Sequence, residues 1–176
     1  MKRFALAVAV PMLLAAGPAL RSSPDLGKTE GRCRPGESGP ALLVEVTGMK
    51  DRTGNLKLEV YPATDQDFLA DDNVLVAAGK TFRRVEVATP QSGAVVLCVR
   101  IPGPGTYAVA VLHDRNMDRR FSWKIDGIGF SANPKLGWSK PKAHASRVVV
   151  NGGGVSKIAV MMNYKSGLGV APLKQK

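Results

Sequence analysis

The sequence contains few of the residues that usually carry out catalysis or bind a metal ion. Its 176 residues include two cysteines and two histidines, which do not cluster into a zinc-binding pattern. It has no GxSxG motif and no HExxH motif, so the serine-hydrolase and zinc-protease templates do not match. The Gly-Lys-Thr at 79–81 has Val74 where a phosphate-binding loop requires glycine. The sequence therefore has no positive signal for catalysis.

Long hydrophobic runs are also scarce, and the one that exists lies at the N-terminus. It extends from Phe4 to Ala16, follows two basic residues, and is shorter than the ~20 residues needed to span a bilayer. Small residues follow it, so residues 1–19 are predicted to be a cleaved secretory signal, with an uncleaved anchor as the alternative. We expect the mature protein to be periplasmic or secreted and not to span a membrane.

Both cysteines, Cys33 and Cys98, lie in the mature chain. In an exported protein an even number of cysteines favours a disulfide, and two free thiols are the alternative. Closing a loop of about 65 residues would stabilise the fold by about 4 kcal/mol. The bridge would attach residues 20–40, whose Pro, Gly, Ser and charged residues are typical of a flexible arm, to the domain.

Alternation of apolar and polar residues predicts a β-rich domain over residues 41–164. The alternating runs occupy residues 42–47, 56–61, 82–88, 94–101, 106–113, 146–150 and 155–164. Gly-rich segments between them are typical of tight turns. About seven short strands joined in this way predict an all-β fold, an immunoglobulin-like or transthyretin-like β-sandwich.

Three segments call for a separate interpretation. Residues 107–112 are apolar throughout, which predicts a central strand covered on both faces. Residues 65–78 are predicted to contain a helix, or else an irregular crossover between strands. Residues 165–176 are rich in Gly and Lys, so we expect a flexible C-terminal tail.

The long segment 114–144 has no alternating pattern and is the main candidate for function. It contains both tryptophans of the chain, so we expect an ordered loop. Four apolar residues, Phe121, Ile125, Ile128 and Phe130, are expected to fold back over one end of the sandwich and leave Trp138 and the basic side chains accessible.

The same segment carries seven Lys or Arg against three Asp, and the whole chain has a formal net charge of +11. Basic residues next to aromatic ones favour an anionic partner, and for an exported protein that is an envelope polysaccharide or lipid headgroup rather than nucleic acid. A merely solvated basic surface is the alternative. The candidate ligand-binding residues are Trp123, Phe130, Asn133, Trp138, Arg119 and Arg120.

A possible metal site begins the segment, where Asp114, Asn116 and Asp118 resemble the start of an EF-hand calcium loop. The match is partial, because Arg119 replaces the required glycine and Ile125 replaces the bidentate glutamate. We favour a turn in which Asp114 and Asn116 accept hydrogen bonds from backbone amides. No cofactor is expected, with calcium as the alternative.

Several longer motifs together indicate a family. They are GNLKLEVYPA at 54–63, PGPGTYAVAVLHDRNMDRRF at 102–121, DGIGFSANP at 126–134 and IAVMMNY at 158–164. With them the chain resembles domain-of-unknown-function family 2141, small exported bacterial proteins. The resemblance implies a β-sandwich outside the cytoplasm and no established activity. Similar sequences are rich in Asp, Asn and Gly after the His-Asp pair, and Met117, Arg119 and Arg120 depart from that pattern.

These observations predict a secreted or periplasmic, non-catalytic binding or envelope-associated module with its contact surface in the segment 114–144. Two alternatives belong to other classes. One is an enzyme that uses His113 and Asp114 as an acid-base pair, for which a cleft around the pair would be evidence. The other is a structural envelope protein stabilised by calcium.

Overall fold

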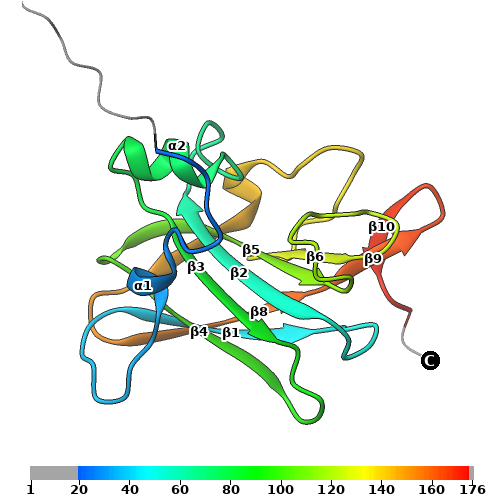
Figure 1. The fold of residues 1–176 in the computed structure, drawn as a ribbon, viewed down its shortest axis with the longest axis horizontal. Coiled ribbons are helices and arrows are strands. Elements are labelled where there is room, and N and C mark those ends of the chain that lie inside the picture. The colour runs from blue at the N-terminus through cyan, green and yellow to red at the C-terminus, as the bar shows by residue number, and fades with distance from the viewer. Residues whose placement is uncertain (1–19, 175–176) are drawn as a thin grey trace, which may run out of the picture.

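The computed structural model describes residues 20–174, so the expected signal segment 1–19 lies outside the described residues (Figure 1). Strands account for 39% and helices for 9% of the chain. The elements are α1 (Lys28–Gly31), β1 (Ala41–Thr47), β2 (Asn55–Pro62), α2 (Asp72–Ala77), β3 (Arg83–Ala88), β4 (Val95–Arg100), β5 (Gly105–Asp114), β6 (Gly127–Phe130), the 3-10 helix η1 (Ala143–Ser146), β7 (Arg147–Val150), β8 (Val155–Met161), β9 (Asn163–Ser166) and β10 (Gly169–Pro172). Within residues 20–174, no helix is both long and apolar enough to cross a membrane.

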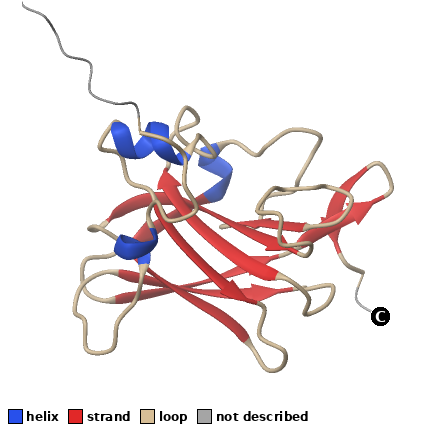
Figure 2. Cartoon of the chain, in the orientation of Figure 1, coloured by secondary structure: helices blue, strands red, loops and turns tan. Residues whose placement is uncertain are grey.

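The strands form two sheets, which confirms the predicted all-β sandwich (Figure 2). The small sheet has the order β4-β1-β8, and the large sheet has the order β10-β9-β6-β5-β2-β3, with β7 also paired to β5. The described residues thus form ten strands, where about seven are predicted. The immunoglobulin-like or transthyretin-like topology stays a prediction.

The main core lies between the sheets and follows the predicted alternation. On β1 the side chains of Leu42, Val44 and Val46 are buried, while Glu45 between them is exposed. On β2 the buried residues again alternate, beginning with Leu56. Alternate side chains of a strand point to opposite faces, so each sheet presents one apolar face to the other.

Strand β5 is buried on both of its faces, as the apolar run 107–112 predicts. Its inward side chains join the main core, and its outward side chains lie in a second apolar cluster on the outer face of the large sheet. That cluster includes Phe68 and Leu75, which the segment between β2 and β3 places over the sheet. The predicted helix within 65–78 is present as α2, over Asp72–Ala77.

A serine joins two short strands along one edge of β5. Residues 105–108 of β5 pair with β7 and residues 110–113 pair with β6, so Val109 lies at the gap between them. The Val109 amide donates to the Ser131 hydroxyl at 3.0 Å, and the Ser131 amide donates to the Val109 carbonyl at 3.0 Å. The Ser131 hydroxyl also bonds the Ser146 carbonyl, so one buried side chain closes the gap.

Strand β6 was not predicted because glycine occupies two of its four positions. A Cβ at Gly127 would lie 2.5 Å from a ring carbon of Tyr164, and one at Gly129 would lie 2.6 Å from Val160. Close packing against β8 and β9 therefore requires glycine there, and glycine removes the alternating pattern that identifies a strand.

The sequence predicts a single strand over 155–164, but the chain changes sheets at Met162, between β8 and β9. Strand β8 belongs to the small sheet and β9 to the large one. Beyond it, β10 pairs with β9, with Val170 opposite Lys165. Figure 1 shows this hairpin extending from the body of the sandwich. Residues 165–172 of the expected tail thus contain the end of β9 and the whole of β10.

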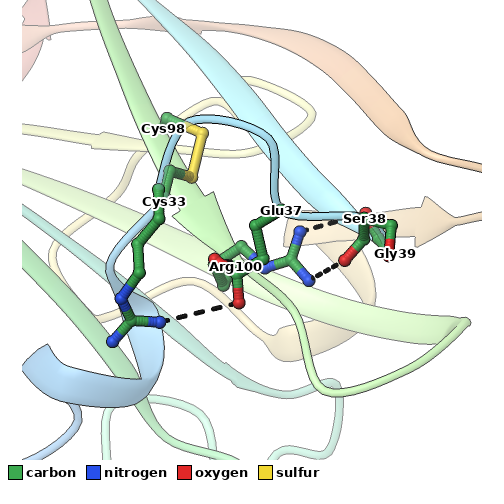
Figure 3. The surroundings of a disulfide bond; sticks show 7 residues. Cys33, Glu37, Ser38, Gly39, Cys98 and Arg100 are labelled. Atoms are coloured by element: carbon green, nitrogen blue, oxygen red, sulfur yellow. Dashed lines mark hydrogen bonds and ion pairs between the residues drawn. A yellow bond between two sulfur atoms is a disulfide. The ribbon is translucent and has the colours of Figure 1, made fainter.

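The expected arm, residues 20–40, lies against the edge of the large sheet. Helix α1 contacts β3, and the Arg84 amide donates to the Gly27 carbonyl at 3.0 Å. The predicted disulfide between Cys33 and Cys98 is confirmed, with 6.0 Å between the two Cα atoms (Figure 3). Beside it, the Arg100 guanidinium donates to the carbonyls of Ser38 and Gly39. The arm thus packs against the edge strands of both sheets, β3 of the large sheet and β4 of the small one.

Candidate functional site

An open groove of about 790 Å³ lies on the outer face of the large sheet. The segment that carries Phe68 and Leu75 covers one part of this face, and the groove occupies the part beside it. Strands β2, β5 and β6 form the floor. The floor residues are Lys57, Glu59, Ala110, Leu112, Ile128 and Phe130.

Three segments form the walls of the groove. Phe121 and Trp123 come from the loop 115–126, residues 136–141 come from the loop after β6, and Leu168 to Val170 come from the β9–β10 hairpin. Leu69 completes the lining. Most of the lining is apolar, as is typical of sites that bind small molecules.

The predicted ligand-binding residues divide into three groups. Trp123, Phe130 and Trp138 line the groove. Arg119 and Arg120 instead line a smaller neighbouring pocket, which shares Lys57 with the groove. The structure therefore brings the aromatic candidates together and places the two arginines beside them.

Asn133, the remaining candidate, lies outside the groove. Its side-chain amide donates to the Ala159 carbonyl at 3.1 Å, and its side-chain oxygen accepts from the Met161 amide at 2.7 Å. Both bonds connect the turn after β6 to β8. Asn133 has a positive φ of 49°, a conformation that asparagine tolerates better than most residues. Its observed contacts are structural.

The expected packing of four apolar loop residues holds for only part of the set. Phe130 is buried and Ile128 is half-buried, while Phe121 and Ile125 are 47% and 41% exposed. The prediction is wrong for the last two because their loop stands beside the sheet as a wall. Trp138 is 85% exposed, as expected.

The alternating pattern of the sequence does not indicate the β9–β10 hairpin that forms one wall of the groove. Leu168 and Val170 lie in a segment whose strands are four residues long, and glycine occupies two of the positions between Ser166 and Val170. The only available signal was an apolar leucine between two glycines, which is also common in unstructured tails.

The single carboxylate in the groove lining is already bound by other groups. Glu59 accepts hydrogen bonds from the Arg84 Nε at 2.8 Å and from the Tyr61 hydroxyl at 2.7 Å. The Lys57 Nζ lies 3.5 Å from the same carboxylate, and the Arg84 Nη2, which is 2.7 Å from Glu59, is also 3.1 Å from Asp72. Burial, and then the charge of Glu59, raise the pKa of Tyr61 well above its usual value. At this end of the floor the positive charges of Lys57 and Arg84 are therefore balanced by the negative charges of Glu59 and Asp72.

The walls carry positive charge that is not balanced in this way. The Lys124 Nζ lies 5.8 Å and the Lys165 Nζ 5.1 Å from the centre of the Trp123 ring, a cation–π arrangement. Lys140 lines the groove, and its Nζ donates to the Phe68 carbonyl. Among the residues that the structure describes, these three lysines form no ion pair. The groove is thus apolar inside and cationic along its walls.

The acidic cluster, formed by Asp114, Asp118 and Asp126, lies at the base of the loop 115–126. One oxygen from each carboxylate lies within 4.8 Å of the others, so these residues could together offer oxygen ligands to a cation. The grouping differs from the predicted Asp114, Asn116 and Asp118, because Asp126 takes the place of Asn116.

All six oxygens of the acidic cluster accept hydrogen bonds within the loop. Asp114 accepts the amides of Asp118 and Arg119, and Asp126 accepts the amides of Arg115 and Ser122. For the remaining carboxylate, Asp118, the donors are the Arg120 amide and the Asn116 side chain, both at 2.8 Å. Its hydrogen bond from the Arg120 amide lowers the pKa of Asp118. The cluster organises the loop that forms one wall of the groove.

The turn interpretation is thus correct for Asp114 and wrong for Asn116, whose side chain binds Asp118 instead of a backbone amide. Met117 and Arg119 have positive φ values of 60° and 65°. Glycine, asparagine and aspartate adopt this conformation more easily than other residues. The tight loop therefore has a conformational reason to favour those residues, apart from any metal.

His113 and Asp114, the alternative acid-base pair, do not face each other. As neighbours on β5 they point to opposite faces of the sheet. His113 is fully buried, its Nε2 donates to the Thr53 carbonyl at 2.7 Å, and its Nδ1 accepts from the Tyr164 hydroxyl at 2.7 Å. Burial lowers the pKa of His113 and raises that of Tyr164 to about 12. Neither residue lines the groove, and His144, the other histidine, is exposed on η1.

A family model described as an uncharacterized protein conserved in bacteria, DUF2141, matches residues 44–158. This match covers more than half of the chain. The chain belongs to this family. The matched region runs from β1 into β8 and includes the floor of the groove and its two loop walls, while the hairpin wall lies beyond it. Comparisons with curated proteins and with solved structures found no match.

Proposed function

We propose that the protein is an exported, non-catalytic binding protein that holds the hydrocarbon chain of an amphiphile in the groove. The observation that carries the proposal is the open apolar groove on the outer face of the large sheet, with aromatic side chains in two of its walls. Large exposed apolar surfaces on soluble proteins usually mark interaction or binding sites. The disulfide and the N-terminal apolar segment support export.

The composition of the lining favours a hydrocarbon chain over a polysaccharide. Apart from the two indoles, the polar side chains are Lys57, Glu59, Ser139 and Lys140. Glu59 is bound by Arg84, and Lys140 by a carbonyl, so few groups are free to bond sugar hydroxyls. Hydroxyls that lose water without gaining a partner oppose binding. A hydrocarbon chain has no such requirement.

The size of the groove also fits a chain-like ligand. Its volume of about 790 Å³ lies within the usual range of small-molecule sites. Each methylene transferred from water to an apolar site contributes about 0.8 kcal/mol. This corresponds to about a fourfold change in Kd per methylene. Affinity should therefore rise steeply with chain length until the groove is full.

Intrinsic fluorescence tests the proposal directly, because both tryptophans of the chain line the groove. We expect titration with uncharged 1-alkanols of increasing length to shift the emission saturably, with Kd falling about fourfold per methylene. The absence of a saturable shift with any alkanol would refute the proposal.

A matched pair of variants locates the binding. Phe121 and Val96 are similarly exposed, at 47% and 50%, but only Phe121 lines the groove. Phe121→Ser should raise the Kd of the longest alkanol several-fold, and Val96→Ser should leave it unchanged. Equal effects of the two substitutions would place the binding elsewhere.

A further inference from the structure

The mouth of the groove is surrounded by apolar side chains that project into solvent. Trp138 is 85% exposed, Leu168 76%, Phe121 47% and Trp123 41%. They come from three segments that are separate in sequence, yet all line the same opening. Single exposed apolar residues are ordinary, whereas a group of them around one opening marks an interaction surface.

Folding does not account for the two most exposed members. Leu168 is at the tip of the β9–β10 hairpin, after Gly167, whose positive φ of 59° makes the turn. Trp138 follows Gly137 in the loop after β6, and a Cβ built on that glycine would meet no atom within 4 Å beyond its own chain neighbours. A polar residue at either position would be equally compatible with the fold. Stability therefore does not explain why these exposed residues are apolar.

The charge around the mouth identifies the partner. The Nζ atoms of Lys124 and Lys165 lie near the Trp123 ring, and Lys140 lies in the wall formed by residues 136–141. The one carboxylate of the lining, Glu59, lies on the floor and is bound by Arg84. Trp is the residue typical of the membrane–water boundary, and lysines near it attract anionic lipid headgroups. The face is therefore complementary to a surface that is anionic outside and apolar beneath.

We infer that this face docks on an anionic lipid membrane, with Trp138 and Leu168 inserted at the level of the headgroups and the groove open toward the bilayer. The inference rests on the proposed function for the occupant of the groove, and it names the membrane as the source of that occupant. In this orientation an acyl chain passes from the bilayer into the groove without crossing water. The lysines then lie beside the headgroups, where their charge stays hydrated.

The test is sedimentation of the protein, purified after export, with lipid vesicles. One set of vesicles contains phosphatidylcholine alone, and in the other set phosphatidylglycerol replaces part of it. We expect binding to the anionic vesicles that weakens as salt is added, and at least tenfold weaker binding to the neutral ones. Equal binding to both sets, or no binding to either, would overturn the inference.

Variants at the mouth test which face docks. Replacing Lys124 and Lys165 with Gln should weaken binding about fivefold for each lysine. Trp138→Ser combined with Leu168→Ser should weaken it at least tenfold, because the apolar insertion is lost. The controls are Val155→Ser and Lys157→Gln on the exposed face of β8, which should bind like the original protein. Loss of binding in the controls, or none in the mouth variants, would contradict the proposed orientation.

The outcomes separate the two proposals. Saturable alkanol binding without vesicle binding would leave the proposed function in place and overturn the docking. Vesicle binding without alkanol binding would support the docking and refute the groove as a chain-binding site. A third outcome is that the protein does not bind vesicles but forms dimers, measured by light scattering. If Trp138→Ser and Leu168→Ser abolish those dimers, a second copy covers this face and the inference is overturned.

Discussion

Two buried serines that touch each other are expected to respond differently to the same substitution. The Ser131 hydroxyl is the partner of the buried Val109 amide and also bonds the Ser146 carbonyl. The Ser146 hydroxyl is buried and has no hydrogen-bond partner among the described residues. Ser131→Ala and Ser146→Ala each remove one oxygen from the same neighbourhood. Only the first leaves an amide at the gap on β5 without its partner.

The magnitudes follow from the cost of burying unpaired polar groups. Ser131→Ala leaves the Val109 N–H without a partner, which costs about 1–3 kcal/mol in the free energy of unfolding. Ser146→Ala removes a polar atom that is itself unpaired, so stability should stay within about 0.5 kcal/mol or rise. The two substitutions should therefore differ by about 2 kcal/mol.

Urea unfolding of both variants, followed by far-ultraviolet circular dichroism, measures this difference. We expect the midpoint to fall for Ser131→Ala and to stay or rise for Ser146→Ala, with the same slope for both. The slope matters because a changed slope would mean that the unfolding reaction itself has changed. Equal losses in the two variants would refute the assignment of Ser131 as the group that closes the gap.

Three further predictions concern stability. Because burial lowers the pKa of His113 below 6.5, the unfolded chain takes up a proton first as pH falls, so the free energy of unfolding should decrease below about pH 6.5; urea midpoints that stay constant from neutral pH down to about pH 5 would contradict this. Replacing Cys33 and Cys98 with Ala should lower the free energy of unfolding by up to about 4 kcal/mol, measured by urea titration, and a loss under about 1 kcal/mol would contradict the loop-closure argument. Since all six oxygens of the acidic cluster accept hydrogen bonds within the loop, calcium should leave the Tm unchanged in differential scanning calorimetry, and a rise in Tm that a chelator reverses would show that the cluster binds the ion.

The parts of the fold that depend on side-chain burial were readable in the sequence. Leu42 and Leu56 lie on strands whose buried core residues largely alternate with more exposed ones, and the uninterrupted apolar run of β5 reflects burial on two faces. The parts that depend on backbone contact were not readable. Gly127 and Gly129 are required by close packing, and the arm binds β3 through the Gly27 carbonyl, so neither produces a hydrophobic pattern.

The sequence likewise indicates only some residues of the candidate site. Trp123 and Trp138 were indicated because large aromatic residues in a long polar segment are unusual. Their relation to the hairpin that carries Leu168 depends on the pairing of β6 with β9, a contact between distant segments with a single register pair. Asp126 joins the acidic cluster through the fold of its loop, which local spacing does not determine.

The parallel pairing of β1 with β8 determines when this fold can be completed. Ala41 lies opposite Val155, so the first strand of the domain receives one neighbour from near the end of the chain and the other from β4. Contacts between such distant residues form slowly, since the whole intervening chain must be closed into a loop. The large sheet can start to form once β2, β3 and β5 are present, but the small sheet cannot form completely before the residues of β8, near position 160, are present. The small sheet can therefore be completed only after most of the chain has been synthesised.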